Sequence, residues 1–115
     1  MTSPKDNTLA TRALTPHLGV QVLHLDPNKP MDDTTIQALE DLIDTHQIVL
    51  LKSADPIDKA AQVALTRQLG EPWKYEYVPG QYRDYPEIFK VTNQQGDGFT
   101  NTGQAWHSDG SSECI

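Results

Sequence analysis

Two residues in this sequence have types and spacing suited to holding a metal ion, His107 and Asp109 in the triplet His107-Ser108-Asp109. Along an extended strand, side chains alternate between two faces, so this imidazole and carboxylate would point the same way, about 7 Å apart. At that separation, a ring nitrogen and a carboxylate oxygen can meet on one ion. With a second histidine from elsewhere, they would form the 2-His-1-carboxylate donor set that non-haem Fe(II) sites use.

The same spacing occurs once more in the chain, in His24-Leu25-Asp26, so context has to separate the two triplets. The first triplet closes an apolar run and is followed by Pro27, which favours a turn or cap role for Asp26 and a surface position for His24. The second triplet follows a long polar loop and an aromatic residue, Trp106, in the kind of setting where sites are built. A turn-capping aspartate beside an exposed histidine remains the alternative interpretation of the second triplet.

Composition limits the class of protein. The chain has 115 residues, of which 37% are hydrophobic, and this suits one small domain or part of a larger one. The net charge is −7 and the 9 basic residues are scattered, so we expect no nucleic-acid partner. The longest aliphatic run, Ile48–Leu51, is far too short for a membrane span. The single cysteine, Cys114, allows no internal disulfide, and the first residues contain no apolar signal segment. We therefore expect a cytoplasmic location.

Apolar patterning predicts three strands. Residues 18–25 are β-branched and mostly apolar, and residues 87–93 have a similar character. The short continuous apolar run at residues 48–52 favours a strand buried on both faces. Residues 1–13 are polar, and we expect them to be poorly ordered.

Two helices are predicted between these strands. For the first, Met31 is placed for a hydrophobic staple, His46 stands at the end, and the candidate N-caps are Asp32, Asp33 and Thr34. For the second, Asp55-Pro56 has the form of an N-cap followed by proline at the first helical position, and Gly70 is a natural end.

The residues after the second predicted helix differ in amino-acid composition from those before it. All four tyrosines and one of the two tryptophans fall within Glu71–Pro86, followed later by a polar, glycine-bearing loop at residues 94–105. Tyrosine and tryptophan combine an apolar body with a polar tip, which suits a pocket wall. A surface loop pinned by aromatic packing is an equal alternative.

The order of these features resembles the N-terminal part of the taurine-dioxygenase-like family of Fe(II)- and 2-oxoglutarate-dependent oxygenases. The resemblance runs nearly from end to end, and its most specific part is the family's Trp-His-x-Asp metal motif. The matching segments are the helix end Thr66–Pro72, the run Tyr85–Val91, and Trp106-His107-Ser108-Asp109.

The resemblance implies an α+β fold, the N-terminal portion of a double-stranded β-helix, or jelly roll, with flanking helices. It implies that His107 and Asp109 are the first two Fe(II) ligands. Molecular oxygen, 2-oxoglutarate and a small organic substrate would then react, with release of succinate and CO2. The residues Gly110-Ser111, after the motif, resemble those found in branches of the family that act on amino-acid-derived metabolites. The candidate substrate-binding residues are Tyr75, Tyr77, Tyr82 and Asn93.

The sequence departs from the family pattern in one respect. The family's second histidine ligand and the arginine that pairs with 2-oxoglutarate lie well after the His-x-Asp motif, and neither has a position here. We therefore expect residues 1–115 to be the N-terminal part of a single domain with an incomplete barrel, inactive alone. One alternative is a non-catalytic interaction module that covers its sheet edge with another chain or as a homo-oligomer. Another is a metal site completed by a partner chain.

Overall fold

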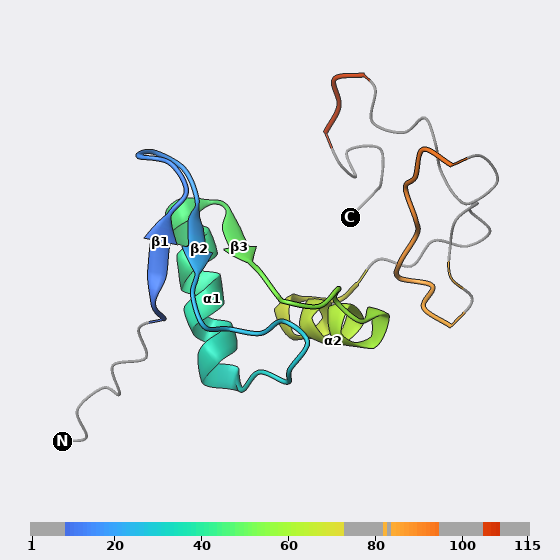
Figure 1. Ribbon diagram of the computed structural model, residues 1–115, viewed down its shortest axis with the longest axis horizontal. Helices are drawn as coiled ribbons and strands as arrows, with labels where there is room; N and C mark the ends of the chain where they lie inside the picture. Colours follow the sequence, from blue (N-terminus) through green and yellow to red (C-terminus); the bar gives the residue numbers. More distant parts are fainter. Residues whose placement is uncertain (1–8, 73–81, 83, 95–104, 109–115) are drawn as a thin grey trace. The chain divides into compact units, whose positions relative to one another are not determined.

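The computed structural model describes residues 9–72, 82, 84–94 and 105–108 (Figure 1). The chain separates into two compact units, Met1–Trp73 and Lys74–Ile115. All regular strands and helices of the described residues lie in the first unit, in the order β1, β2, α1, β3, α2.

A three-stranded sheet of order β1-β2-β3 forms the first layer of this unit. β1 (Thr11–Ala13) pairs antiparallel with β2 (Val20–Val22), and β3 (Val49–Leu51) pairs parallel with β2. The strands predicted at residues 18–25 and 48–52 are therefore present, with shorter hydrogen-bonded cores. The expectation of poor order over residues 1–13 is wrong for β1. Its backbone is held by β2, and the Arg12 guanidinium donates to the Gln21 side-chain oxygen opposite, at 2.7 Å.

Gly19 makes the tight return between β1 and β2 possible. Its φ of +84° lies in the left-handed region that only glycine adopts without strain. A Cβ at this position would also lie 3.0 Å from a side-chain carbon of Leu14. The Leu14 amide donates to the Gly19 carbonyl at 3.0 Å and closes the hairpin.

Helix α1 (Asp33–His46) begins as its sequence predicts. Asp32 is the N-cap, and its side chain accepts a hydrogen bond from the Thr35 amide at 2.8 Å. Met31 and Ile36, the two positions of a hydrophobic staple, are both buried in the same core cluster. His46 is the last helical residue, as expected, and Gln47 follows with a φ of +66°.

The core lies where the sheet meets the helices. Val22, Met31, Ile36 and Leu39 form its buried centre, and Leu39 is only 2% exposed. Partly buried residues around it are Leu9, Leu25, Leu42, Val49, Leu51 and Leu65. The prediction that the third strand is buried on both faces is wrong, because all three residues of β3 are only partly buried. β3 lies at an edge of the sheet described here, so it has a partner strand on one side only.

Helix α2 (Lys59–Leu69) begins later than its sequence predicts. The N-cap is Asp58, so the prediction that Asp55-Pro56 starts the helix is wrong by three residues. The cause is Asn28, far away in sequence. The side-chain oxygen of Asn28 accepts a hydrogen bond from the Asp58 backbone amide at 2.7 Å. The side-chain nitrogen of Asn28 donates one to the Pro56 carbonyl at 3.2 Å. The helix ends at Gly70 as predicted, with the Gly70 amide donating to the Thr66 carbonyl.

In the second unit, the strand predicted at residues 87–93 is reduced to isolated β-bridges at Phe89 and Val91. The described residues thus form a mixed α and β structure, a three-stranded sheet with two helices. No helix among the described residues is long and apolar enough to cross a bilayer.

Candidate metal centre

His107 lies in a short described segment, Ala105–Ser108, and its side chain is exposed. The segment is not part of a strand, so the extended strand expected around the triplet is not present at His107. Asp109 lies outside the described residues. The prediction that the two side chains point the same way therefore stays a prediction.

The imidazole of His107 is held by the backbone just before it. Nδ1 lies 2.7 Å from the carbonyl oxygen of Ala105, two residues earlier. A carbonyl oxygen can only accept a hydrogen bond, so this contact is a hydrogen bond when Nδ1 carries a proton. Trp106, between the two, is fully exposed. This contact joins the His107 ring to the backbone of its own segment, two residues earlier.

The triplet His24-Leu25-Asp26 has the structural role that its context predicts. The Asp26 carboxylate accepts a hydrogen bond from the backbone amide of Asn28 at 2.9 Å. The backbone carbonyl of Asp26 accepts one from the backbone amide of Lys29 at 3.1 Å. His24 is exposed, with a φ of +59°. These contacts make Asp26 the anchor of a turn and confirm that prediction.

The other two histidines also have positions in the first unit that are explained by the backbone. The carbonyl of His46 accepts from the amides of Gly19 and Ile48, at 3.1 and 2.8 Å. The backbone amide of His17 donates to the Thr15 hydroxyl at 3.3 Å, in the return between β1 and β2. Within residues 9–72, 82, 84–94 and 105–108, no group of three or more His, Cys, Asp or Glu side chains could hold a metal ion.

Two of the four candidate substrate residues are described. Tyr75 and Tyr77 lie outside the described residues. Tyr82 is half-buried, and its backbone closes a loop: its amide donates to the Ile88 carbonyl at 3.2 Å and its carbonyl accepts from the Tyr85 amide at 3.2 Å. Asn93 is exposed in a bend. That these residues line a substrate pocket stays a prediction.

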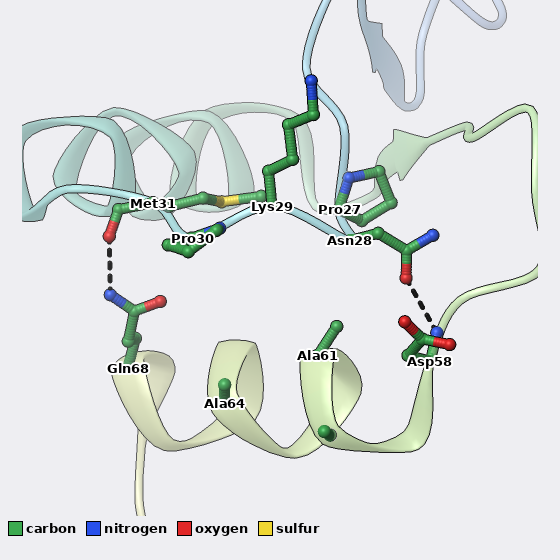
Figure 2. Close-up of a pocket in the computed structure, with 10 residues that line it drawn as sticks. Pro27, Asn28, Lys29, Pro30, Met31, Asp58, Ala61, Ala64 and Gln68 are labelled. Carbon is green, nitrogen blue, oxygen red and sulfur yellow. Dashed lines mark hydrogen bonds between the residues drawn. The ribbon is translucent and has the colours of Figure 1, made fainter.

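Sequence patterns gave no signal for a groove of about 510 Å³ in the first unit, between the loop Pro27–Met31 and α2 (Figure 2). The α2 side of the groove is lined chiefly by alanines, with small side chains that let the loop lie close. Asn28 binds the backbone of Asp58 at one end, and the Gln68 amide donates to the Met31 carbonyl at 2.9 Å at the other. Lys29 points away from α2 (Figure 2). The amide side chains are thus used to fasten the loop to the helix.

A second recess, of about 670 Å³, lies beside the edge strand. It is lined by β3, the segment Ser53–Ile57, Pro27 and Leu65. Its lining is mostly aliphatic, and Asp55 is the only ionisable side chain in it. Neither recess gathers the donor atoms that a metal ion needs.

Comparison with known proteins places these features in a family. The family model for the taurine catabolism dioxygenases, TauD, TfdA family, matches residues 10–115. Among solved structures, a taurine dioxygenase from Burkholderia xenovorans matches with a TM-score of 0.65 and 20% identity. AAD-2, in complex with Mn(II) and N-oxalylglycine, matches with a TM-score of 0.52 and 23% identity.

These matches cover most of this chain and a smaller share of each solved one. The first covers 71% of this chain and 29% of the Burkholderia enzyme, and the second covers 67% of this chain and 26% of AAD-2. At such identities the likeness shows a shared fold. The chain therefore spans less than a third of either solved structure.

Proposed function

The chain belongs to the TauD, TfdA family of taurine catabolism dioxygenases, and from this premise we propose that it carries two of three Fe(II) ligands of a 2-oxoglutarate-dependent dioxygenase. Residues 10–115 would form the opening part of one jelly-roll domain. The third ligand and the group that binds the 2-oxoglutarate carboxylate would lie in the part of the domain that this chain does not span.

The observation that carries the proposal is the triplet His107-Ser108-Asp109 inside the matched range, directly after Trp106. An imidazole and a carboxylate suit a divalent first-row metal ion, and the carboxylate offsets part of its charge. The three other histidines of the chain lie in a helix end or in turns of the first unit. We choose His107 as the ligand because it is the histidine that stands in the Trp-His-x-Asp triplet.

The chemistry depends on both groups that would bind here. When bound, Fe(II) and 2-oxoglutarate would supply the chemistry that activates O2. O2 is the oxidant; 2-oxoglutarate would give two electrons and be converted to succinate and CO2, and a small organic substrate would give the other two. AAD-2 offers a chemical parallel, because its complex contains Mn(II) and N-oxalylglycine, which has the carbon–oxygen skeleton of 2-oxoglutarate with one methylene replaced by NH. In this chain, His107 and Asp109 would hold the metal, while Tyr75, Tyr77, Tyr82 and Asn93 would contact the substrate.

The experiment is an anaerobic titration of Fe(II) and 2-oxoglutarate into the longest natural protein that contains this sequence. We expect the weak visible charge-transfer band of a chelated 2-oxoglutarate complex. His107→Asn should remove the band, because an amide is a much weaker metal ligand than an imidazole.

The matched control is His24→Asn. It makes the same substitution in the other His-x-Asp triplet, and asparagine tolerates the positive φ found there. The band should be unchanged. A band that survives His107→Asn, or no band in the unsubstituted protein, would contradict the proposed function.

A further inference from the structure

The hydrogen bond between His107 and Ala105 bears on which ring nitrogen would meet the metal. A neutral imidazole carries one proton, on either Nδ1 or Nε2, and only the nitrogen without the proton can donate a lone pair to a metal ion. At 2.7 Å, Nδ1 and the Ala105 carbonyl oxygen would repel each other if both were acceptors. The contact therefore favours the tautomer with the proton on Nδ1.

We propose that the Ala105 carbonyl is a positioning group for the metal centre: it fixes the Nδ1–H tautomer of His107 before any metal binds and directs Nε2 to the metal. This inference rests on the proposed role of His107 as a ligand. Metal-bound histidines commonly donate their second ring N–H to an oxygen acceptor, which fixes both tautomer and ring orientation. Here the acceptor is a main-chain atom two residues away.

The hydrogen bond is local, and this gives it two properties. It joins residues 105 and 107 without using any other element, so it can form before the rest of a metal site is assembled. It also uses a backbone atom, so every residue type at position 105 would supply it. The ligand would thus be oriented by its own segment, while the segment itself is exposed and not part of a strand.

The direct test is a long-range 1H–15N correlation spectrum of the chain with 15N-labelled histidine, recorded without metal and with the imidazoles neutral. We expect His107 to show a protonated Nδ1 and an unprotonated Nε2. His17 and His24, both exposed, serve as internal controls and should show the Nε2–H form that imidazoles favour in water. An Nε2–H tautomer at His107 would overturn the inference.

A second measurement separates this inference from the proposed function. Zn(II), a diamagnetic substitute for Fe(II), is added well in excess of the chain. A shift of the His107 Nε2 signal with Nδ1 still protonated supports both. A shift at Nδ1 overturns the inference but keeps His107 as a ligand. No shift at either nitrogen of His107 removes it as a ligand, and the inference falls with it.

Two methylated histidines at position 107 give a matched pair of variants. Nε2-methylhistidine blocks the proposed donor atom, and the Zn(II) response at residue 107 should disappear. Nδ1-methylhistidine keeps Nε2 but cannot donate to Ala105. We expect its affinity for Zn(II) to fall about 10- to 100-fold, the range seen when such outer hydrogen bonds are lost. If the Nε2-methyl variant binds Zn(II) like the unmodified chain, the metal is not at Nε2.

Discussion

Two triplets of the same composition and spacing have different surroundings in this molecule. In His24-Leu25-Asp26 the carboxylate is already in use, because it accepts the Asn28 amide and anchors a turn. In His107-Ser108-Asp109 it is the imidazole that is held, by the Ala105 carbonyl two residues before it. Spacing alone therefore does not define a metal site. Among the described atoms, the Asp26 carboxylate is hydrogen-bonded to the backbone in the first triplet, and the His107 imidazole in the second.

The two triplets also depend on different parts of the molecule. His24 and Asp26 follow β2 in a unit with a buried core, and Leu25 packs against that core. The bond that orients His107 is made within residues 105–107 of the other unit. The first triplet should therefore respond to changes in the core of the first unit, whereas the His107–Ala105 hydrogen bond should persist as long as its own segment is intact.

The largest effect should come from Leu39→Ala, which truncates a side chain that is 2% exposed. We expect the free energy of unfolding of the first unit to fall by about 2–5 kcal/mol, measured by chemical denaturation. The Nδ1–H tautomer of His107 should stay unchanged. Ile43→Ala, on the same helix at 39% exposure, is the control and should cost clearly less. Loss of the His107 tautomer in Leu39→Ala would show that the two regions are coupled.

The second effect concerns metal affinity. Asp109→Ala removes a proposed ligand and should weaken binding of Fe(II) or Zn(II) about 100-fold or more, beyond the range for outer hydrogen bonds. Asp26→Ala, the same change in the other triplet, should leave the affinity as it is. Calorimetric titration of both variants measures the difference. Equal losses in the two would remove the distinction between the triplets.

A smaller effect should separate the triplets by stability. Asp26→Ala removes the acceptor of the Asn28 amide, and we expect the free energy of unfolding to fall by about 0.5–1.5 kcal/mol. Asp26→Asn keeps a side-chain oxygen at the same place and should lose much less. Asp109→Ala should not change the unfolding of the first unit. Thermal and chemical denaturation of the three variants tests this, and an unaffected Asp26→Ala would mean that the turn does not need its anchor.

A substitution at His24 should raise the free energy of unfolding, unlike those above. The φ of +59° at this position costs a non-glycine residue about 1–2 kcal/mol, whereas glycine pays about 0.5–1 kcal/mol in added chain entropy. His24→Gly should therefore raise the free energy of unfolding by about 0.5–1 kcal/mol. His107→Gly should leave it unchanged. A destabilised His24→Gly would show that the His24 side chain has contacts that outweigh the strain.

The parts of the fold that the sequence predicts are those set by neighbouring side chains. Asp32 caps α1 and Met31 completes a staple through residues three to five positions away, so both are visible as local patterns. The start of α2 is not local, because Asn28 holds the Asp58 amide across thirty residues. β1 is exposed along its whole length and exists because β2 pairs with it, so it has no apolar alternation to reveal it.

The candidate site shows the same division. Residue types and spacing indicate His107 as a candidate metal ligand, because the sequence alone identifies an imidazole and its distance along the chain from a carboxylate. The sequence does not indicate the orientation of this imidazole, because the acceptor is the main-chain oxygen of Ala105 and every residue has one. The groove along α2 has no local signal either. The alanines at helical spacing favour close packing against a sheet, and the Gln68–Met31 hydrogen bond that fastens the loop to α2 spans thirty-seven residues.

The smallest effect concerns another carboxylate that the backbone has engaged. Hydrogen bonds from Thr35, from its side chain and then its amide, lower the pKa of Asp32 below 3.8. The lowered pKa means that folding favours the ionised form of Asp32. The stability that this ionised carboxylate adds is fully present above pH 3.8 and is lost as the pH falls through the folded-state pKa. Asp32 is fully exposed, so the slope should be slight.

Asp32→Asn is the variant that isolates this charge, because asparagine can still cap α1 but does not titrate. Between pH 5 and 2, the difference in unfolding free energy between the unsubstituted chain and Asp32→Asn should shrink as the pH falls. The outcome against this is that the free energy of unfolding of Asp32→Asn changes with pH just as that of the unsubstituted chain does. In that case the helix needs only the capping oxygen of residue 32 and not its charge.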